Sequence, residues 1–419
     1  MPGRLVGREI RLTDPILVVR GAVALIAAAT VVAAFARRLS LPDSVVLVLA
    51  GLLGASLFPE IALAVTPGLV LGVFVPGLVF AAAYSIDWTD LRPVLGPILA
   101  LAIPGVLASA AVVGFALHVG GGLPLELAFV VGAITAATDP VAVVATMRRL
   151  DVPRGLRTLV DGESLLNDGT GLVLFALAVR NVEAGVGAAD AMVRFVGTIA
   201  VSGVVGVAGG LVAARLVRST EERTIQLAVS LVTAYGTYQL ADVFGLSGIL
   251  ATVIAGVALG SRMRRTAGSQ VLVREIEDLW DVVAFILTSL VFLLIGFAVR
   301  PSSLIGAGGA VAVATGAVVV GRALIVYLPA AAVRLWRRAQ VVPRGWTHVI
   351  FWSGLRGAIA LAAALSLPAD FPERELLQQI SFGIVLVTLL VQGAGAPIVV
   401  RWALRGAEGP TALRSAERS

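Results

Sequence analysis

The chain has 419 residues, of which 58% are hydrophobic and only 14% are charged, and its mean hydropathy is +0.98. Soluble domains carry about 25% charged residues, so this composition excludes a soluble protein and predicts an all-α, polytopic membrane protein. Cysteine is absent and only two histidines occur, which excludes disulfides and thiolate sites and argues against a transition-metal centre. The net charge of +6 comes from arginines that lie between apolar segments, which indicates membrane orientation rather than nucleic-acid binding.

Windows of about 20 apolar residues predict thirteen membrane-spanning helices in a single membrane domain. This domain covers residues 15–403, between an N-terminal tail (1–14) and a short C-terminal tail (404–419). The predicted spans are 15–36, 42–58, 65–85, 94–118, 124–147, 158–179, 190–214, 223–241, 245–260, 279–299, 303–333, 346–367 and 377–403.

Arginines alternate along the connections between these spans. Connections after odd-numbered spans hold 18 arginines, whereas those after even-numbered spans hold only Arg180, Arg300 and Arg374. Because positively charged connections stay on the cytoplasmic side, the pattern predicts a multi-pass protein of the cell membrane (plasma or inner). Its N-terminus would lie outside the cell and its C-terminus in the cytoplasm.

Five ionisable residues lie deep inside the predicted spans: Asp139, Glu163, Asp168, Arg322 and Arg356. A carboxylate at that depth costs at least ~2.5–3.5 kcal/mol, and such groups usually mark an ion pathway or a proton relay. We therefore treat these five residues as the candidate functional groups.

Two of the spans are interrupted. The segment Thr138-Asp139-Pro140 carries cap-forming side chains followed by proline, which is typical of a helix start, yet it lies near the middle of an apolar stretch. In the segment 351–365, Gly354 and Gly357 bracket Arg356. Broken spans are tolerated where their backbone lines a site, and a pair of them in opposite halves indicates a secondary transporter built from inverted repeats.

The segment "DGESLLND" (161–168) places polar groups on two faces of one helix. Ser164 and Asp168 are four residues apart and share a face, whereas Glu163 points about 100° away from Ser164. Because arginine does not lose its proton, Arg356 needs a partner, and we expect it to pair with Glu163. Arg322 has two interpretations, which remain open: it balances negative charge near the site, or it reaches the cytoplasmic interface.

These residues resemble the monovalent cation/proton antiporter-1 family, the NhaP-type bacterial and NHE-type eukaryotic sodium/proton exchangers. The matching stretches are "TDPVAVVATMRRLDVPRGLRTLVDGESLLNDGTGLVLF", "FGLSGILATVIAGVALG", "SLVFLLIGFAV" and "WSGLRGAIALAAAL". The resemblance implies an inverted-repeat antiporter fold of thirteen spans with two discontinuous helices, assembled as a homodimer in the lipid bilayer.

The resemblance also implies residue roles. Asp168 would be the site where cation and proton compete, with Asp139 and Ser164 as ligands and Thr138 contributing its main-chain carbonyl. Asn167 would be the asparagine of the family's Asn-Asp pair, which accompanies electroneutral exchange. Glu163 and Arg356 match the family's structural ion pair.

One position departs from the family pattern. Where the family often has an acidic residue in the third span, this chain has Ala81. The sequence therefore leaves the choice among Na⁺, K⁺ and Li⁺ open.

The physical chemistry of these residues agrees with antiport by alternating access. Burial favours the protonated form of a carboxyl group and a bound cation favours its charged form, so Asp168 would carry one or the other. No Walker-type loop is present, and we expect a transporter rather than an enzyme, with no cofactor. The alternatives are an uncoupled cation channel or uniporter, and a membrane sensor that has kept the fold without transport.

Overall fold

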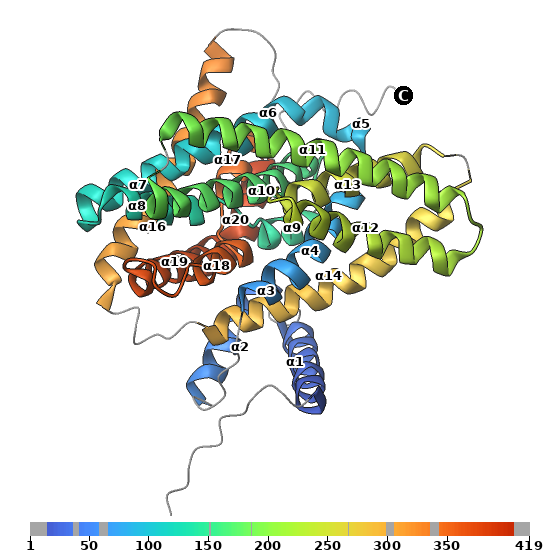
Figure 1. Cartoon of the computed structure of the whole chain (residues 1–419), viewed down its shortest axis with the longest axis horizontal. Helices are drawn as coiled ribbons and strands as arrows, with labels where there is room; N and C mark the ends of the chain where they lie inside the picture. Colours follow the sequence, from blue (N-terminus) through green and yellow to red (C-terminus); the bar gives the residue numbers. More distant parts are fainter. Residues whose placement is uncertain are drawn as a thin grey trace, which may run out of the picture.

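In the computed structural model, every regular element of the described residues is a helix (Figure 1). The structure describes residues 15–36, 42–57, 66–150, 152–185, 187–266, 268–298, 306–335 and 343–405. The α-helices are α1 (Pro15–Ala36), α2 (Asp43–Leu57), α3 (Pro67–Leu69), α4 (Val75–Ser85), α5 (Trp88–Leu91), α6 (Leu95–Ala100), α7 (Val106–Gly121), α8 (Leu125–Ile134), α9 (Val141–Arg149), α10 (Arg154–Ala184), α11 (Ala188–Arg218), α12 (Arg223–Val243), α13 (Gly248–Arg264), α14 (Gln270–Ala298), α16 (Gly308–Leu335), α17 (Arg344–Trp352), α18 (Ala358–Leu365), α19 (Arg374–Thr388) and α20 (Ala394–Arg405).

Each predicted span overlaps one or more of these helices, which confirms the all-α membrane architecture. By length and composition, six continuous helical segments of the described residues are apolar enough to cross a membrane. The count of thirteen crossings and the inverted repeat stay predictions. The predicted tail 1–14 lies outside the described residues, as do residues 406–419 of the C-terminal tail.

Both predicted interruptions are present. Residues 135–140 separate α8 from α9, and residues 353–357 separate α17 from α18. Pro140 immediately precedes α9, where its missing N–H costs no intrahelical hydrogen bond. The two breaks place backbone N–H and C=O groups outside regular helices in the interior of the protein, and residues 137–140 and Gly357 line a cavity.

Three wide helical turns, which the sequence analysis did not predict, interrupt other helices. They are the π-helices η1 (Val70–Phe74), η3 (Leu101–Gly105) and η4 (Leu389–Gly393). In η3, Pro104 interrupts the hydrogen-bond ladder. The Thr170 hydroxyl on α10 donates a 2.5 Å hydrogen bond to the carbonyl of Ala102, which satisfies this part of the backbone from a neighbouring helix.

The helices form two groups on either side of the cavity. One group contains α2, α4, α11, α12, α13 and α14, and the other contains α7, α8, α10, α16, α18 and α19. In Figure 1, α7, α8 and α16 lie on the left, α12 and α14 lie towards the right, and α4, α9 and α10 lie between them. The second group contains α8 and α18, which are one half of each broken helix.

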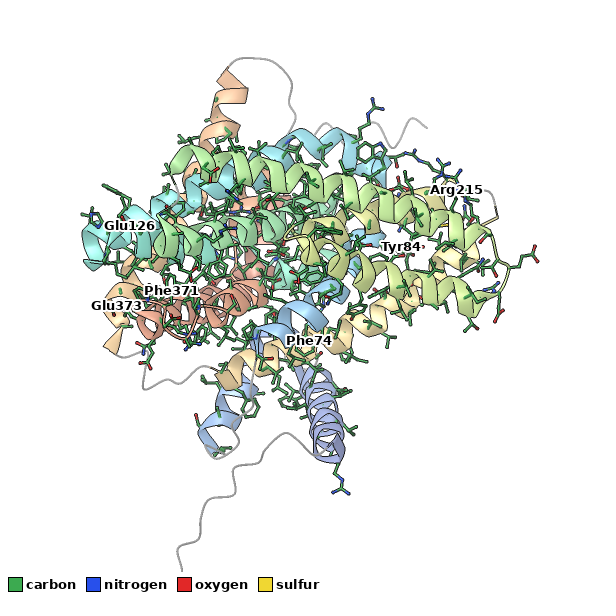
Figure 2. All side chains as sticks on the ribbon, in the orientation of Figure 1. Phe74, Tyr84, Glu126, Arg215, Phe371 and Glu373 are labelled. Carbon is green, nitrogen blue, oxygen red and sulfur yellow. The ribbon has the colours of Figure 1, made fainter. Side chains whose placement is uncertain are left out.

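Charged side chains mark the two ends of the molecule (Figure 2). Arg215, near the end of α11, lies at one end, and Glu126 and Glu373 lie at the opposite end. The predicted topology also assigns these residues to opposite sides of the membrane. Which side faces the cytoplasm stays a prediction.

Within the first group, glycines allow α2 and α14 to pack closely. A Cβ atom added at Gly296 would lie 2.7 Å from the Leu52 nitrogen and 2.8 Å from the Cα of Gly51. Small residues let helix backbones approach in membrane proteins, where hydrophobic driving force between helices is absent. The α2–α14 contact therefore depends on Gly51 and Gly296.

We expect Gly296→Ala to lower the free energy of unfolding by about 1–3 kcal/mol, because the added methyl group forces the two backbones apart. The measurement is thermal unfolding of the purified protein in detergent. Gly316→Ala on α16 is the matched control, since a Cβ there meets open space. Equal stability of the two variants would contradict the proposed close packing.

Candidate functional site

A cavity of about 440 Å³ lies between the two groups of helices. Its walls come from α2, α4 and α14 on one side and from α9, α10, α18 and the break before α9 on the other. The exposed side chains of Arg148 and Asp281 stand at its mouth. Thr138, Asp139, Ser164 and Asp168 also line it, so the structure brings four of the predicted site residues to one cavity.

The two broken helices are joined at Asp139. Its backbone N–H donates a 2.8 Å hydrogen bond to the carbonyl of Leu355 in the second break. Its carboxylate accepts hydrogen bonds from the backbone N–H of Val141, at the start of α9, and of Ala358, at the start of α18. A side chain at Gly357 would occupy the position of the Asp139 carboxylate. One acidic residue thus balances the positive ends of two half-helices.

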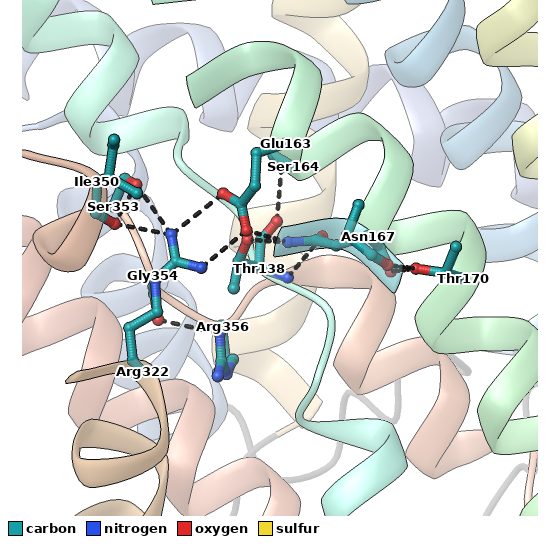
Figure 3. Close-up of polar contacts among 11 residues, drawn as sticks. Thr138, Glu163, Ser164, Asn167, Thr170, Arg322, Ile350, Ser353, Gly354 and Arg356 are labelled. Atoms are coloured by element: carbon teal, nitrogen blue, oxygen red, sulfur yellow. Dashed lines mark hydrogen bonds and ion pairs between the residues drawn. The ribbon is translucent and has the colours of Figure 1, made fainter. Parts of the chain in front are cut away.

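Asn167 and Ser164 hold the first break against α10 (Figure 3). The Ser164 hydroxyl donates a 2.6 Å hydrogen bond to the Thr138 carbonyl. The Asn167 amide nitrogen donates to the Thr138 hydroxyl and to Glu163 Oε1, and its amide oxygen accepts from the Thr138 N–H. Both Asn167 and Thr138 are buried. Asn167 therefore positions the broken backbone and has few groups left to offer a ligand.

Asp168 differs from the other acids of the site. Among the described residues, its carboxylate has no hydrogen-bond or ion-pair partner, although the residue is only 8% exposed. It follows Ser164 by one turn of α10 and lines the cavity. A buried carboxylate is costly unless something neutralises it, so Asp168 requires either a proton or a cation.

The expected ion pair between Glu163 and Arg356 is not the pair that the structure forms. Glu163 instead binds Arg322 of α16 through two hydrogen bonds, of 2.7 and 3.1 Å, and both side chains are almost fully buried (Figure 3). The carbonyl of Ile350 also accepts a hydrogen bond from Arg322. Glu163 thus ties α10 to α16, and of the two interpretations of Arg322 the interfacial one does not fit its burial.

Arg356 lies in the second break and is 1% exposed. Its guanidinium donates to the carbonyl of Gly354, and its backbone N–H donates a 3.2 Å hydrogen bond to the Thr388 hydroxyl. Its side chain lines a small internal space together with Glu163 and Asn167. Arg356 therefore supplies a positive charge close to the acids, without forming an ion pair with any described residue.

Asp161 was missed by the sequence reasoning. It lies on α10 seven residues before Asp168, which is two helical turns, and it lines the same cavity nearer the arginine-bearing end of the helix. The spacing 161, 164, 168 could have identified it, because these residues share one helical face. Among the described residues, no three His, Cys, Asp or Glu side chains are grouped as a metal site requires.

Comparisons with known proteins place the chain among transporters. A family model described as "Sodium/hydrogen exchanger, transmembrane" matches residues 23–402. The Na⁺/H⁺ antiporter ApNhaP of Aphanothece halophytica is 35% identical over 86% of this chain and 69% of its own length. The Na⁺/H⁺ antiporter NhaH of Halobacillus aidingensis is 31% identical over 90% of this chain and 96% of its own length.

Among solved structures, the sodium proton antiporter MjNhaP1 of Methanocaldococcus jannaschii has the same fold. Its TM-score with this chain is 0.76, and the match covers 93% of this chain and 98% of that protein. The identity is 19%, so this likeness concerns the fold alone.

The identity of the Glu163 partner can be tested by double-mutant cycles. Removing either Glu163 or Arg322 should cost about 3–5 kcal/mol of unfolding free energy, because one buried charge loses its partner. Thermal unfolding of Glu163→Gln, Arg322→Gln and the double variant should reveal strong coupling. The same cycle with Arg356→Gln should be closer to additive. Stronger coupling of Glu163 to Arg356 than to Arg322 would contradict the observed pair.

Proposed function

The chain belongs to the sodium/hydrogen exchanger family, and from that premise we propose that it exchanges a monovalent cation, Na⁺ or else K⁺ or Li⁺, for H⁺ across the membrane. The cation and the proton compete for Asp168. The oxygens of Asp139 and Ser164 and the Thr138 carbonyl assist in holding the cation.

The free carboxylate of Asp168 is the observation that carries this proposal. Glu163 is paired with Arg322, and Asp139 accepts hydrogen bonds from two helix N-termini. Asp168 has no such partner among the described residues and lines the cavity. Burial favours the protonated carboxyl and a cation favours the charged one, so a single group binds one proton or one cation at a time.

Competition at one carboxylate also supports electroneutral exchange by alternating access. One monovalent cation and one proton neutralise Asp168 equally, so equal charge crosses in each direction. The empty, charged carboxylate would be expensive to carry through the closed interior between the two groups of helices. Only the loaded protein then changes its conformation, and this restriction couples the two fluxes.

The cavity mouth suggests which side is open. Arg148 stands there, in one of the arginine-rich connections that the positive-inside rule assigns to the cytoplasm. We propose that this conformation is open to the cytoplasm, with the chain's N-terminus outside. The homodimer that the family resemblance implies is part of the same proposal.

Replacing Asp168 with Asn should abolish exchange and leave the protein folded. The change keeps the side chain's size while removing a buried charge that has no partner, so thermal stability should be unchanged or higher. The measurement is dye-reported proton flux in proteoliposomes with an imposed pH gradient, to which Na⁺, K⁺ or Li⁺ is added in turn. Glu183→Gln, an exposed acid at the end of the same helix, is the matched control and should exchange normally.

Three results would count against this proposal. Normal exchange by the Asp168→Asn variant would remove Asp168 from the mechanism. Cation flux through the wild-type protein without proton flux would favour the uncoupled channel or uniporter. Wild-type protein that is folded but gives no flux with any of the three cations would favour the sensor.

Exchange of one cation for one proton should move no net charge. A jump in Na⁺ concentration over proteoliposomes on a solid-supported electrode should therefore produce no current beyond that of Asp168→Asn proteoliposomes. The pH dye should report proton release in the same preparation. A sustained current that requires the wild-type protein would refute electroneutrality, without affecting the assignment of Asp168.

A further inference from the structure

Two neighbouring hydroxyl groups on α14 lack the hydrogen bonds that helical hydroxyls usually make. Serine and threonine inside a helix commonly donate to a backbone carbonyl three or four residues earlier, as Thr233 and Ser381 do here. Within the described residues, Thr288 and Ser289 donate to no carbonyl, and both line the cavity that contains Asp168. Ser289 is only 4% exposed, and its unpaired hydroxyl is available to a ligand that binds in the cavity.

A third hydroxyl lies at the same level on α2. Gly51 and Gly296 mark the close contact between α2 and α14. The residues before this contact line the same cavity on both helices, with Ser44 on α2 and Thr288 and Ser289 on α14. Ser44 and Ser289 each lie seven residues, or two turns, before these contact glycines and on the same faces. Ser44 is 3% exposed, and its hydroxyl also has no hydrogen-bond partner among the described residues.

The oxygen atoms proposed so far as cation ligands come from α10 and the first break. A cation bound by these oxygens alone would be coordinated on one side only. Asp168, Ser164 and the Thr138 carbonyl all belong to the group of helices that carries the breaks. A cation that sheds its water needs oxygen atoms around it to replace that hydration shell. On the facing wall, Leu78, Val79 and Ala81 of α4 have no side-chain oxygen, and the hydroxyl of Ser85 donates to the carbonyl of Ala82. Asp281 of α14 carries a carboxylate, but it is exposed and lies two helical turns before Thr288. Thr288 and Ser289 of α14 are hydroxyls on this wall that have no hydrogen bond of their own among the described residues.

We propose that Thr288 and Ser289, supported by Ser44, complete the oxygen shell of the cation held at Asp168 and help to determine which cation is selected. This inference rests on the proposed function and adds specificity-determining ligands from the facing wall. Small cations hold water most tightly, so loss of the hydroxyls weakens binding of Li⁺ and Na⁺ more than binding of K⁺.

The test is the double variant Thr288→Val/Ser289→Ala, assayed by cation-dependent proton flux in proteoliposomes. Loss of these ligands should raise the apparent KM for Na⁺ about tenfold, as expected for about 1.4 kcal/mol of lost binding. The KM for K⁺ should rise less, so that the Na⁺/K⁺ preference shifts. The maximal rate and the thermal stability should stay near the wild-type values, because a change in ground-state binding alone affects KM.

Matched variants separate a ligand role from a packing role. Thr288→Ser/Ser289→Thr keeps both hydroxyls and should retain the wild-type Na⁺/K⁺ preference. Thr233→Val/Ser381→Ala removes hydroxyls that donate to their own helices and should leave both KM values unchanged.

The outcomes also separate this inference from the proposed function. If Thr288→Val/Ser289→Ala keeps both KM values while Asp168→Asn is inactive, the hydroxyls are not ligands and antiport at Asp168 stands. If the KM values for Na⁺ and K⁺ rise by the same factor, the selectivity role is wrong. If wild-type protein exchanges no cation for protons, the proposed function fails, and this inference fails with it.

Discussion

The crossing of two broken helices is the constraint on which the site depends. Asp139 joins them through its N–H, which binds the Leu355 carbonyl, and through its carboxylate, which binds the first N–H groups of α9 and α18. Inside a membrane, backbone N–H and C=O groups outside regular helices are tolerated only where they are hydrogen-bonded or line a cavity. Satisfying both helix starts with one side chain keeps the crossing closed. It also leaves carbonyl and carboxylate oxygens beside a cavity.

The remaining buried charges are arranged so that one acid is left without a partner. Arg322 neutralises Glu163, Asn167 holds the Thr138 backbone, and Arg356 lies in the second break without an ion pair among the described residues. The backbone at or beside the breaks is held from three helices. Arg322 of α16 donates to the Ile350 carbonyl, Asn167 of α10 accepts from the Thr138 N–H, and Thr388 of α19 accepts from the Arg356 N–H. Asp168 differs from these residues, because it is buried, lines the cavity and has no partner among the described residues. An exchange mechanism requires this combination.

The two walls of the cavity have different chemistry. The wall that carries the breaks supplies Asp139, Asp168 and backbone oxygens, whereas the wall of α2, α4 and α14 supplies mostly apolar side chains, a few hydroxyls and the acidic residues Asp43 and Asp281. Close glycine packing holds α2 and α14 together as a unit. A movement of one wall against the other would leave the charged residues and their partners intact. In the alternating access that we propose, such a movement exposes the cation to opposite sides without breaking the Glu163–Arg322 pair.

The sequence by itself determined the helical membrane class, the positions of both breaks and the five buried ionisable residues from which the proposed site is drawn. These features follow from local rules: apolar length, proline and glycine within a span, and the faces set by helical spacing. Tertiary structure decided which arginine pairs with Glu163, because Arg322 and Arg356 are both buried and sequence spacing does not show which helix packs beside α10. It also decided that Asp139 reaches the start of α18 as well as that of α9, and that Thr288 and Ser289 line the cavity that contains Asp168. The Glu163–Arg322 pair and the contact of Asp139 with the start of α18 join segments more than a hundred residues apart, and only the packing of helices brings those segments together.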